Sequence, residues 1–315
     1  MVNMARRLLC VTYVLCLSSL PLTVCGTNTE LTAKIFVTDE DTENKIYVAD
    51  LQDDLDFSSI PSTKEPRYIT YDSVEKKIYW TDKDTKRVYR ADVDGGNREV
   101  VTSESSDELR GIAIAETSRT LYIANKSPKK ITSVSIAQGS PFPRAETDFA
   151  SGLSEELYSL EVDEEKGFLY WSLKYSIERK PLVGSGGTQT IYQNSDLSEI
   201  TGLSIDISRD PRRIFFCDFG KKQSFYKDVN QPLTSTGSAD ELTDYMNDAD
   251  ISGEKEREKL RDISYFDGTL YWTKEGGPNG IAVMTNYDQS SPSFDIKETS
   301  AIGKPFQLLT INVNP

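Results

Sequence analysis

A five-residue pattern that recurs six times is the feature of this sequence that most restricts its fold. The copies read IFVTD from Ile35, IYWTD from Ile78, LYIAN from Leu121, LYWSL from Leu169, IFFCD from Ile214 and LYWTK from Leu270. The aromatic residue at the second position recurs at intervals of 43 to 56 residues. One four-stranded blade of a β-propeller occupies roughly 40 to 50 residues. The pattern therefore predicts an all-β fold, a six-bladed β-propeller.

Short alternating stretches precede five of the six copies, and alternation of this kind is typical of a half-buried strand. They are YITYD from Tyr68, GIAIA from Gly111, SLEVD from Ser159, GLSID from Gly202 and DISYF from Asp262. The first copy lacks such a stretch, but the sequence ends with FQLLTINV from Phe306. We therefore expect the N- and C-terminal strands to share one blade, which closes the ring and removes exposed sheet edges.

The second copy carries a more specific signal. IYWTD from Ile78, followed by RVYRADVDGG from Arg87, resembles the class B (YWTD) repeat of the low-density lipoprotein receptor family. The resemblance covers the chain from about Lys34 to Val313. That family's propellers are usually accompanied by cysteine-rich modules, and this sequence has none. Lipoprotein uptake is therefore not expected here.

The resemblance also implies a role for the acids that end the pattern. Asp39, Asp82 and Asp218 are expected to accept hydrogen bonds that tie neighbouring blades together. The aromatic residues of the pattern are expected to pack between blades, although a ligand cage is the alternative. These aromatic residues are Tyr79, Trp80, Tyr170, Trp171, Tyr271 and Trp272.

The first 26 residues have the composition of a secretory signal peptide. Arg6 and Arg7 precede an apolar stretch, and Gly26 stands at the small-residue position before a cleavage site. A membrane anchor is the alternative, but Ser18, Ser19 and Pro21 interrupt the apolar run. We expect residues 1–26 to be a signal peptide and residues 27–315 to form one secreted propeller domain without membrane insertion.

The composition of the chain excludes several classes of function. The formal net charge is −14 and there is no histidine. Such an acidic chain repels nucleic acid. Without histidine, serine-histidine triads, histidine general bases and histidine metal ligands are excluded. We therefore expect no enzyme and no dedicated cofactor, although the acidic composition leaves calcium open.

Two local patterns add weaker predictions. Asn125, Lys126 and Ser127 form a sequon, which makes Asn125 a glycosylation candidate. An insertion from Ser238 to Leu260 resembles the opening of a calcium-binding EF-hand loop, but Lys259 stands where the loop needs a glutamate. Its candidate ligands are Asp248, Asp250 and Ser252. An exposed acidic loop with a short charged helix is the competing interpretation.

The loops that enter the innermost strands of a propeller surround one mouth of the central channel. Equivalent positions, two places before the first apolar strand residue, are Arg67, Arg110, Tyr158, Thr201, Arg261 and, by a looser alignment, Phe306. Arginine and aromatic residues are the side chains enriched in interface hot spots, so this ring is expected to bind a ligand. The alternative is that the arginines only neutralise neighbours such as Glu65, Glu108 and Asp262.

These observations favour a secreted extracellular binding or adaptor module that takes a protein ligand at the channel mouth. Two alternatives remain open. A calcium-dependent hydrolase or lactonase is disfavoured because the predicted ring is basic and aromatic, with no evident acidic cluster. An acidic component of an extracellular matrix would bind calcium loosely through net charge. The sequence shows no oligomerisation segment and does not identify the ligand.

Overall fold

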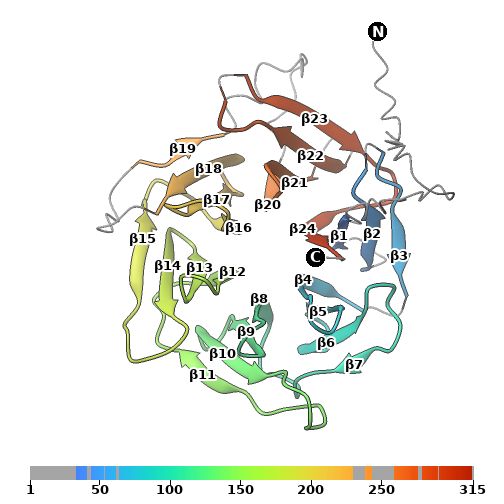
Figure 1. The fold of residues 1–315 in the computed structure, drawn as a ribbon, viewed down its shortest axis with the longest axis vertical. Coiled ribbons are helices and arrows are strands. Elements are labelled where there is room, and N and C mark those ends of the chain that lie inside the picture. Colours follow the sequence, from blue (N-terminus) through green and yellow to red (C-terminus); the bar gives the residue numbers. More distant parts are fainter. Residues whose placement is uncertain are drawn as a thin grey trace, which may run out of the picture. The chain divides into compact units, whose positions relative to one another are not determined.

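The alternating stretches fold as strands of six antiparallel four-stranded sheets around a central axis (Figure 1). The computed structural model describes residues 33–40, 44–52, 54–61, 64–229, 238–242, 259–275, 279–289 and 291–313. All elements among these residues are strands. The prediction of an all-β, six-bladed propeller is confirmed.

Each blade places its strands in chain order from the axis outward, except blade 1. Blade 1 consists of β24 (Pro305–Asn312), β1 (Ala33–Asp39), β2 (Ile46–Asp50) and β3 (Ser58–Ile60). Blade 2 contains β4 (Pro66–Asp72), β5 (Lys77–Asp82), β6 (Arg87–Asp92) and β7 (Glu99–Val100). Blade 3 contains β8 (Leu109–Ala115), β9 (Thr120–Asn125), β10 (Lys130–Ser135) and β11 (Thr147–Ala150).

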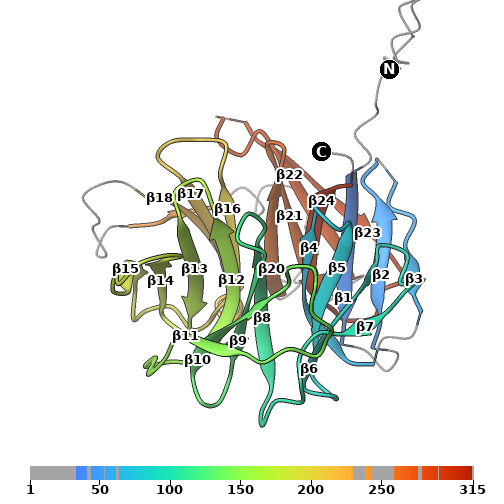
Figure 2. The same ribbon diagram turned by 60° about the horizontal axis from the view of Figure 1, so that its bottom comes forward.

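The remaining three blades repeat this order. Blade 4 contains β12 (Leu157–Asp163), β13 (Phe168–Leu173), β14 (Ser176–Pro181) and β15 (Gln189–Gln193). Blade 5 contains β16 (Ile200–Asp206), β17 (Arg213–Asp218), β18 (Gln223–Asp228) and β19 (Asp240–Glu241). Blade 6 contains β20 (Lys259–Phe266), β21 (Thr269–Glu275), β22 (Gly280–Thr285) and β23 (Ser293–Glu298). Figure 2 shows the innermost strands side by side around the axis.

Blade 1 closes the ring with strands from the two ends of the described chain. β24 pairs antiparallel with β1 from Ala33 opposite Asn312 to Asp39 opposite Pro305. The sharing of one blade by the N- and C-terminal strands is confirmed (Figure 1). Because β1 has a neighbour on both sides, it presents no free edge to solvent.

The hydrophobic core lies between neighbouring blades. Trp80, Trp171 and Trp272 are at most 1% exposed. Each tryptophan shares an apolar cluster with the motif aromatic residue of the preceding blade, for example Phe36 with Trp80 and Phe215 with Trp272. Tyr79 and Tyr170 are also buried, whereas Tyr271 is half-buried. The repeated aromatic residues therefore pack blade against blade.

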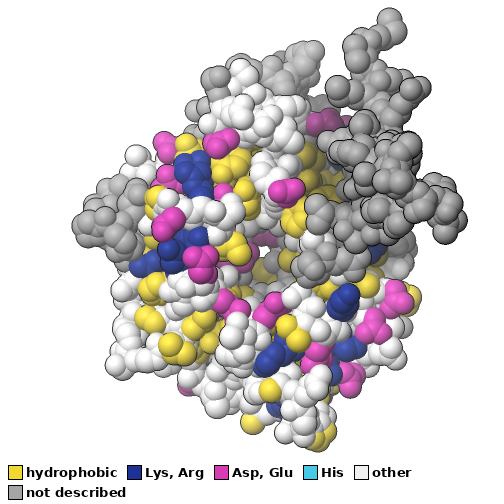
Figure 3. Space-filling view, in the orientation of Figure 1, with side chains coloured by type: hydrophobic (Ala, Val, Ile, Leu, Met, Phe, Trp, Pro, Cys, Tyr) yellow, Lys and Arg dark blue, Asp and Glu magenta, His cyan; other side chains and the backbone are white. Residues whose placement is uncertain are grey.

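The ring encloses a hollow centre (Figure 3). Acidic and basic side chains are interspersed on the face that Figure 3 shows. Inside the channel, the innermost strands line a cavity of about 110 Å³. Its titratable lining residues are Glu161 of β12 and Asp262 of β20.

Candidate binding site at the channel mouth

Irregular pairing at the start of the innermost strands aims side chains toward the channel mouth. In blades 2 to 6 the register between the first and second strand shifts between Pro66 and Ile69, Leu109 and Ile112, Leu157 and Leu160, Ile200 and Gly202, and Leu260 and Ile263. In blade 1 the shift lies opposite Phe306. A β-bulge re-aims a side chain and is frequent beside functional sites. All six residues predicted for the mouth lie within these shifts.

The fourth residue of the repeated pattern stabilises these bulges. The Thr81 hydroxyl accepts the N–H of Tyr68 at 3.2 Å, and the Thr273 hydroxyl accepts that of Asp262 at 3.0 Å. Ser172 and Thr38 do the same for Ser159 and Gln307. A bulge removes these N–H groups from the ladder, and a buried N–H needs an acceptor. The sequence signal was the recurrence of threonine and serine at this position, whose role our sequence analysis missed.

In the three blades whose pattern ends in an aspartate, that aspartate fixes the loop before the bulge. Asp82 accepts the N–H of Glu65 at 2.9 Å, and Asp218 accepts that of Ser198 at 2.7 Å. Asp39 accepts the N–H of Lys304 at 2.6 Å. These loops connect one blade to the next, so the carboxylates have the role that the family resemblance implied. They also set the position of the mouth residue that follows two or three positions later.

Close contact between innermost strands explains a glycine beside two of the bulges. A Cβ atom on Gly111 would lie 2.3 Å from the carbonyl oxygen of Tyr158, and one on Gly202 would lie 2.7 Å from Cα of Asp262. Only glycine permits this approach of neighbouring backbones. The bulges of adjacent blades are therefore in direct contact around the mouth.

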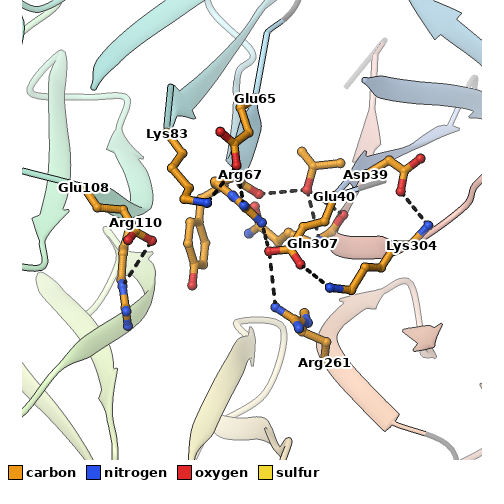
Figure 4. A network of polar contacts seen from close by, with 12 residues as sticks. Asp39, Glu40, Glu65, Arg67, Lys83, Glu108, Arg110, Arg261, Lys304 and Gln307 are labelled. Carbon is orange, nitrogen blue, oxygen red and sulfur yellow. Dashed lines mark hydrogen bonds and ion pairs between the residues drawn. The ribbon is translucent and has the colours of Figure 1, made fainter. Parts of the chain in front are cut away.

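The mouth residues line one cavity of about 410 Å³. Its lining includes all six predicted residues, Arg67, Arg110, Tyr158, Thr201, Arg261 and Phe306. Further lining residues that the sequence analysis did not assign to the mouth include Glu40, Lys83, Glu199 and Phe219. Figure 4 shows Arg67, Arg110 and Arg261 together with their acidic neighbours. Equivalent positions in different blades thus converge in space.

The charge of the mouth differs from the basic ring that we predicted. Arg67, which is 7% exposed, donates to Glu65 at 2.6 Å and forms an ion pair with Glu40. Arg110 donates to the carbonyl of Leu157 at 3.0 Å and forms an ion pair with Glu156 at 3.0 Å. Two of the three predicted arginines are therefore held by this chain's own acids and carbonyls.

The acids that neutralise the mouth follow a simple rule of position. A glutamate stands two residues before the mouth residue in four consecutive blades: Glu65, Glu108, Glu156 and Glu199. Lysines from the following loops pair with two of them, Lys83 with Glu65 at 2.9 Å and Lys126 with Glu108 at 3.2 Å. The mouth therefore contains acidic side chains at positions other than the six aligned ones.

Arg261 has a different environment from the other two arginines. Its guanidinium lies between the rings of Phe219 and Phe306, at 4.4 and 4.7 Å from their centroids. Its nearest carboxylates, Glu40 and Glu275, are both at 3.6 Å. The Thr201 hydroxyl donates to the backbone carbonyl of Arg261 at 2.5 Å. The Thr201 side chain lines the cavity, but its hydroxyl proton is already used to hold the backbone of β20 in place.

Burial raises the pKa of two side chains at the mouth, Tyr158 and Asp262. Burial, followed by the nearby Glu199, raises the pKa of Tyr158, so its hydroxyl remains a hydrogen-bond donor at neutral pH. Burial raises the pKa of Asp262 to about 8, against the opposing effect of the Leu308 N–H that it accepts at 3.0 Å. Asp262 lines both the mouth and the channel cavity. It is therefore mostly uncharged at neutral pH.

The other sequence candidates lie apart from this cavity. Asp248, Asp250 and Ser252 fall outside the described residues. Among the described residues, no group of three or more acidic, histidine or cysteine side chains is placed to hold a metal ion. Asn125 is 5% exposed, and its amide donates to the Thr132 hydroxyl at 3.1 Å. In the folded chain this amide faces the core. No helix in the described part of the chain has the length and apolarity needed to span a membrane.

Comparison with known proteins adds to the resemblance seen in the sequence. A low-density lipoprotein receptor-related protein 1 of Pyricularia oryzae is 32% identical over 123 residues, which span 34% of this chain and 40% of that relative. The crystal structure of a nidogen/laminin complex contains a chain with a TM-score of 0.69 and 18% identity, with coverage of 88% of this chain and 97% of that one. The resemblance to the class B (YWTD) propellers is confirmed. No model of a protein family matches the chain.

YWTD propellers are not the only solved structures with this fold. A catalytically inactive histidine-to-alanine variant of virginiamycin B lyase from Staphylococcus aureus, solved with quinupristin, has a TM-score of 0.55 and 13% identity. The match covers 85% of this chain and 85% of that one. At this identity the likeness shows the fold alone. The function of this chain is therefore inferred from the geometry and chemistry of the residues at the channel mouth.

Proposed function

We propose that this chain is a secreted extracellular binding module that engages a protein partner at the channel mouth. The observation that supports it is the convergence of six bulge residues, one from each blade, on a single cavity of about 410 Å³. Side chains that the fold aims at one point by separate local irregularities are typical of a recognition site.

The composition of the mouth supports a protein ligand. Tyr158, Phe219 and Phe306 supply aromatic surface at low conformational cost, and an arginine guanidinium lies over each of these three rings. Aromatic residues and arginine dominate interface hot spots. The nidogen structure, which has the same fold, was solved as a complex with laminin. We infer a protein partner for this chain as well.

An enzymatic function has less support. In the virginiamycin B lyase structure, the variant that replaces a histidine by alanine is catalytically inactive, and this chain has no histidine. A calcium-dependent hydrolase or lactonase would need one tight calcium site, and an acidic matrix component would show many weak ones. Calcium titration by calorimetry distinguishes both from a binding module, for which we expect no heat from a tight site.

An N-linked glycan introduced at the rim of the cavity tests whether the partner binds at the mouth. Lys83 lines the mouth cavity and its side chain is 42% exposed. Lys83→Asn, together with Asp84 and Thr85, creates a sequon, so a secreted chain would acquire a bulky glycan at the rim. Val183→Asn creates a matched sequon with Gly184 and Ser185 in the β14–β15 loop, where Val183 is 81% exposed.

The two glycosylated chains should behave differently as baits for extracellular proteins. We expect the Val183→Asn chain to capture the same partner as wild type and the Lys83→Asn chain to lose it. Capture by both glycosylated chains would place the binding surface outside the mouth. If the wild-type chain with its own first 26 residues were retained in cells, secretion would be wrong.

A further inference from the structure

Among the described residues, the Arg261 guanidinium donates no hydrogen bond, whereas Arg67 donates to Glu65 at 2.6 Å and Arg110 to the Leu157 carbonyl at 3.0 Å. The ion pairs of Arg261 with Glu40 and Glu275 are both 3.6 Å long, which exceeds hydrogen-bond distance. Its Nε atom is buried, and within the described residues it has no acceptor. The Glu275 Oε2 atom, 3.6 Å from the guanidinium, likewise has no hydrogen-bond donor in the part of the chain that the structure describes. The donors of one mouth arginine therefore await an acceptor.

The Arg261 guanidinium is nevertheless held in place. It is stacked between Phe219 of the loop after β17 and Phe306 of β24. Its backbone is fixed in the β20 bulge, where the Thr201 hydroxyl donates to its carbonyl. The side chain is 18% exposed, so an incoming group can reach it. A planar guanidinium that is already ordered loses little entropy when it binds.

Arg261 belongs to a network of ion pairs at the mouth. The ion pairs visible in Figure 4 connect it through Glu40 to Arg67 and Lys304. Glu65, Lys83 and Glu275 complete this network. The ion pairs join four cations, Arg67, Lys83, Arg261 and Lys304, to three carboxylates, Glu40, Glu65 and Glu275. Asp39 adds a fourth carboxylate, which accepts the N–H of Lys304 at 2.6 Å. Within this balanced network Arg261 has the longest ion pairs, so its charge is the most available to an incoming carboxylate.

We propose that Arg261 anchors one carboxylate from an acidic side chain of the protein partner, an inference that rests on the proposed function. The guanidinium fork matches the two oxygens of a carboxylate, which would accept the hydrogen bonds that Glu40 and Glu275 are too distant to accept. Arg67 and Arg110 then stabilise the mouth and do not contact the partner's anion. A sulfated or phosphorylated polymer is disfavoured, because Glu108 and Glu199 also line the mouth and repel multiple negative charges.

Disulfide-closed heptapeptides displayed on phage provide a probe that needs no known partner. Peptides that bind the wild-type chain but not the Lys83→Asn glycosylated chain are specific for the mouth. We expect them to share an aspartate or glutamate. Replacing that residue by its amide should weaken binding to wild type by about 10- to 100-fold, the range for a hydrogen-bonded charged group.

Two variants of Arg261 decide whether that carboxylate meets this side chain. On Arg261→Gln the acidic peptide and its amide version should bind within about threefold of each other, because the charge-assisted contact is gone. Arg261→Lys keeps the charge but not the fork, and we expect it to bind the acidic peptide about tenfold more weakly than wild type. Arg87→Gln removes a charge from β6, outside the mouth lining, and should leave the affinity unchanged.

The outcomes separate this inference from the proposed function. Mouth-specific peptides whose acid-to-amide loss is the same on wild type and on Arg261→Gln would overturn Arg261 as the anchor but leave the binding mouth intact. Mouth-specific peptides without a shared acid would do so as well. If every selected peptide also binds the Lys83→Asn glycosylated chain, the proposed mouth and the anchor are both wrong.

Discussion

Arg212 of blade 5 donates from Nε to the carboxylate of Asp163 of blade 4 at 2.7 Å, and the two side chains are only 5% and 1% exposed. Blades 2 and 3 are joined in the same way, where Arg119 donates from Nη1 to Asp72 at 2.6 Å. In both pairs the aspartate ends an innermost strand and the arginine comes from the next blade. Because the innermost strands begin at the mouth, these pairs tie the blades at the opposite end of the channel.

Breaking one of these pairs should be costly. Arg212→Ala leaves the Asp163 carboxylate buried without its cation, and we expect the free energy of unfolding to fall by about 3–5 kcal/mol. Urea denaturation monitored by tryptophan fluorescence measures the change. The exposed pair of Lys166 and Asp210 also joins blades 4 and 5, at 2.9 Å. Lys166→Ala should cost less than about 1 kcal/mol. Equal costs for the two variants would show that burial does not set the strength of the Arg212 pair.

Ring closure predicts a strong effect of a short deletion. Removing residues 305–313 deletes β24, which pairs with β1 along its whole length and whose Gln307 side-chain oxygen accepts the N–H of Ile69 in blade 2. The deletion exposes the edge of β1 and opens the apolar cluster that contains Leu308. We expect the truncated chain to aggregate or to be retained, whereas removal of residues 314–315 alone should have no effect. A truncated chain with the wild-type melting temperature would refute closure by β24.

Trp171 and Trp272 should differ in their tolerance of phenylalanine. Trp171 donates from Nε1 to Glu178 at 3.1 Å, whereas Nε1 of Trp272 is buried without an acceptor among the described residues. Trp171→Phe should therefore cost about 1–2 kcal/mol more than Trp272→Phe. Trp272→Ala leaves a cavity in the core and should lower the free energy of unfolding by about 3–5 kcal/mol. Thermal unfolding of the three variants tests this order, and the reverse order for the two phenylalanine variants would contradict it.

The fold was predictable because each blade repeats the same local chemistry. The aromatic pairs such as Tyr79 and Trp80 recur at blade length, and the alternating stretches before them are the innermost strands. The closure by β24 was also predictable. The first copy of the pattern has no strand-like stretch before it, and the stretch from Phe306 has no copy of the pattern after it. Periodicity alone carries this information.

The mouth was predictable only in part. Alignment of equivalent positions located residues such as Arg67 and Arg261, because a symmetrical ring converts equivalent positions into neighbours in space. It did not identify their partners. Glu40 comes from the end of β1 in another blade, and Phe219 from a loop after β17, so both depend on loop geometry that periodicity does not encode. Consequently the sequence overstated the positive charge of the ring.

Two carboxylates inside the channel give the protein an unusual dependence on pH. Burial raises the pKa of Glu161 to about 8, and Asp262 contributes to this shift. Burial likewise raises the pKa of Asp262 to about 8. Both groups titrate near pH 4 in an unfolded chain. Between about pH 4 and pH 8 the folded state thus keeps protons that the unfolded state releases, and the stability that these groups contribute falls as pH rises through that window.

Glu161→Gln should remove part of this dependence. Glutamine has the size of glutamate but carries no charge, so the variant avoids the cost of ionising a carboxylate in the channel beside Asp262. We expect the variant to melt at least about 2 °C above wild type at pH 8.5 and within about 1 °C of it at pH 4.5. Because all other titrating groups are shared, the difference between the two pH profiles isolates Glu161. A constant difference at both pH values would mean that Glu161 titrates alike in the folded and unfolded chain.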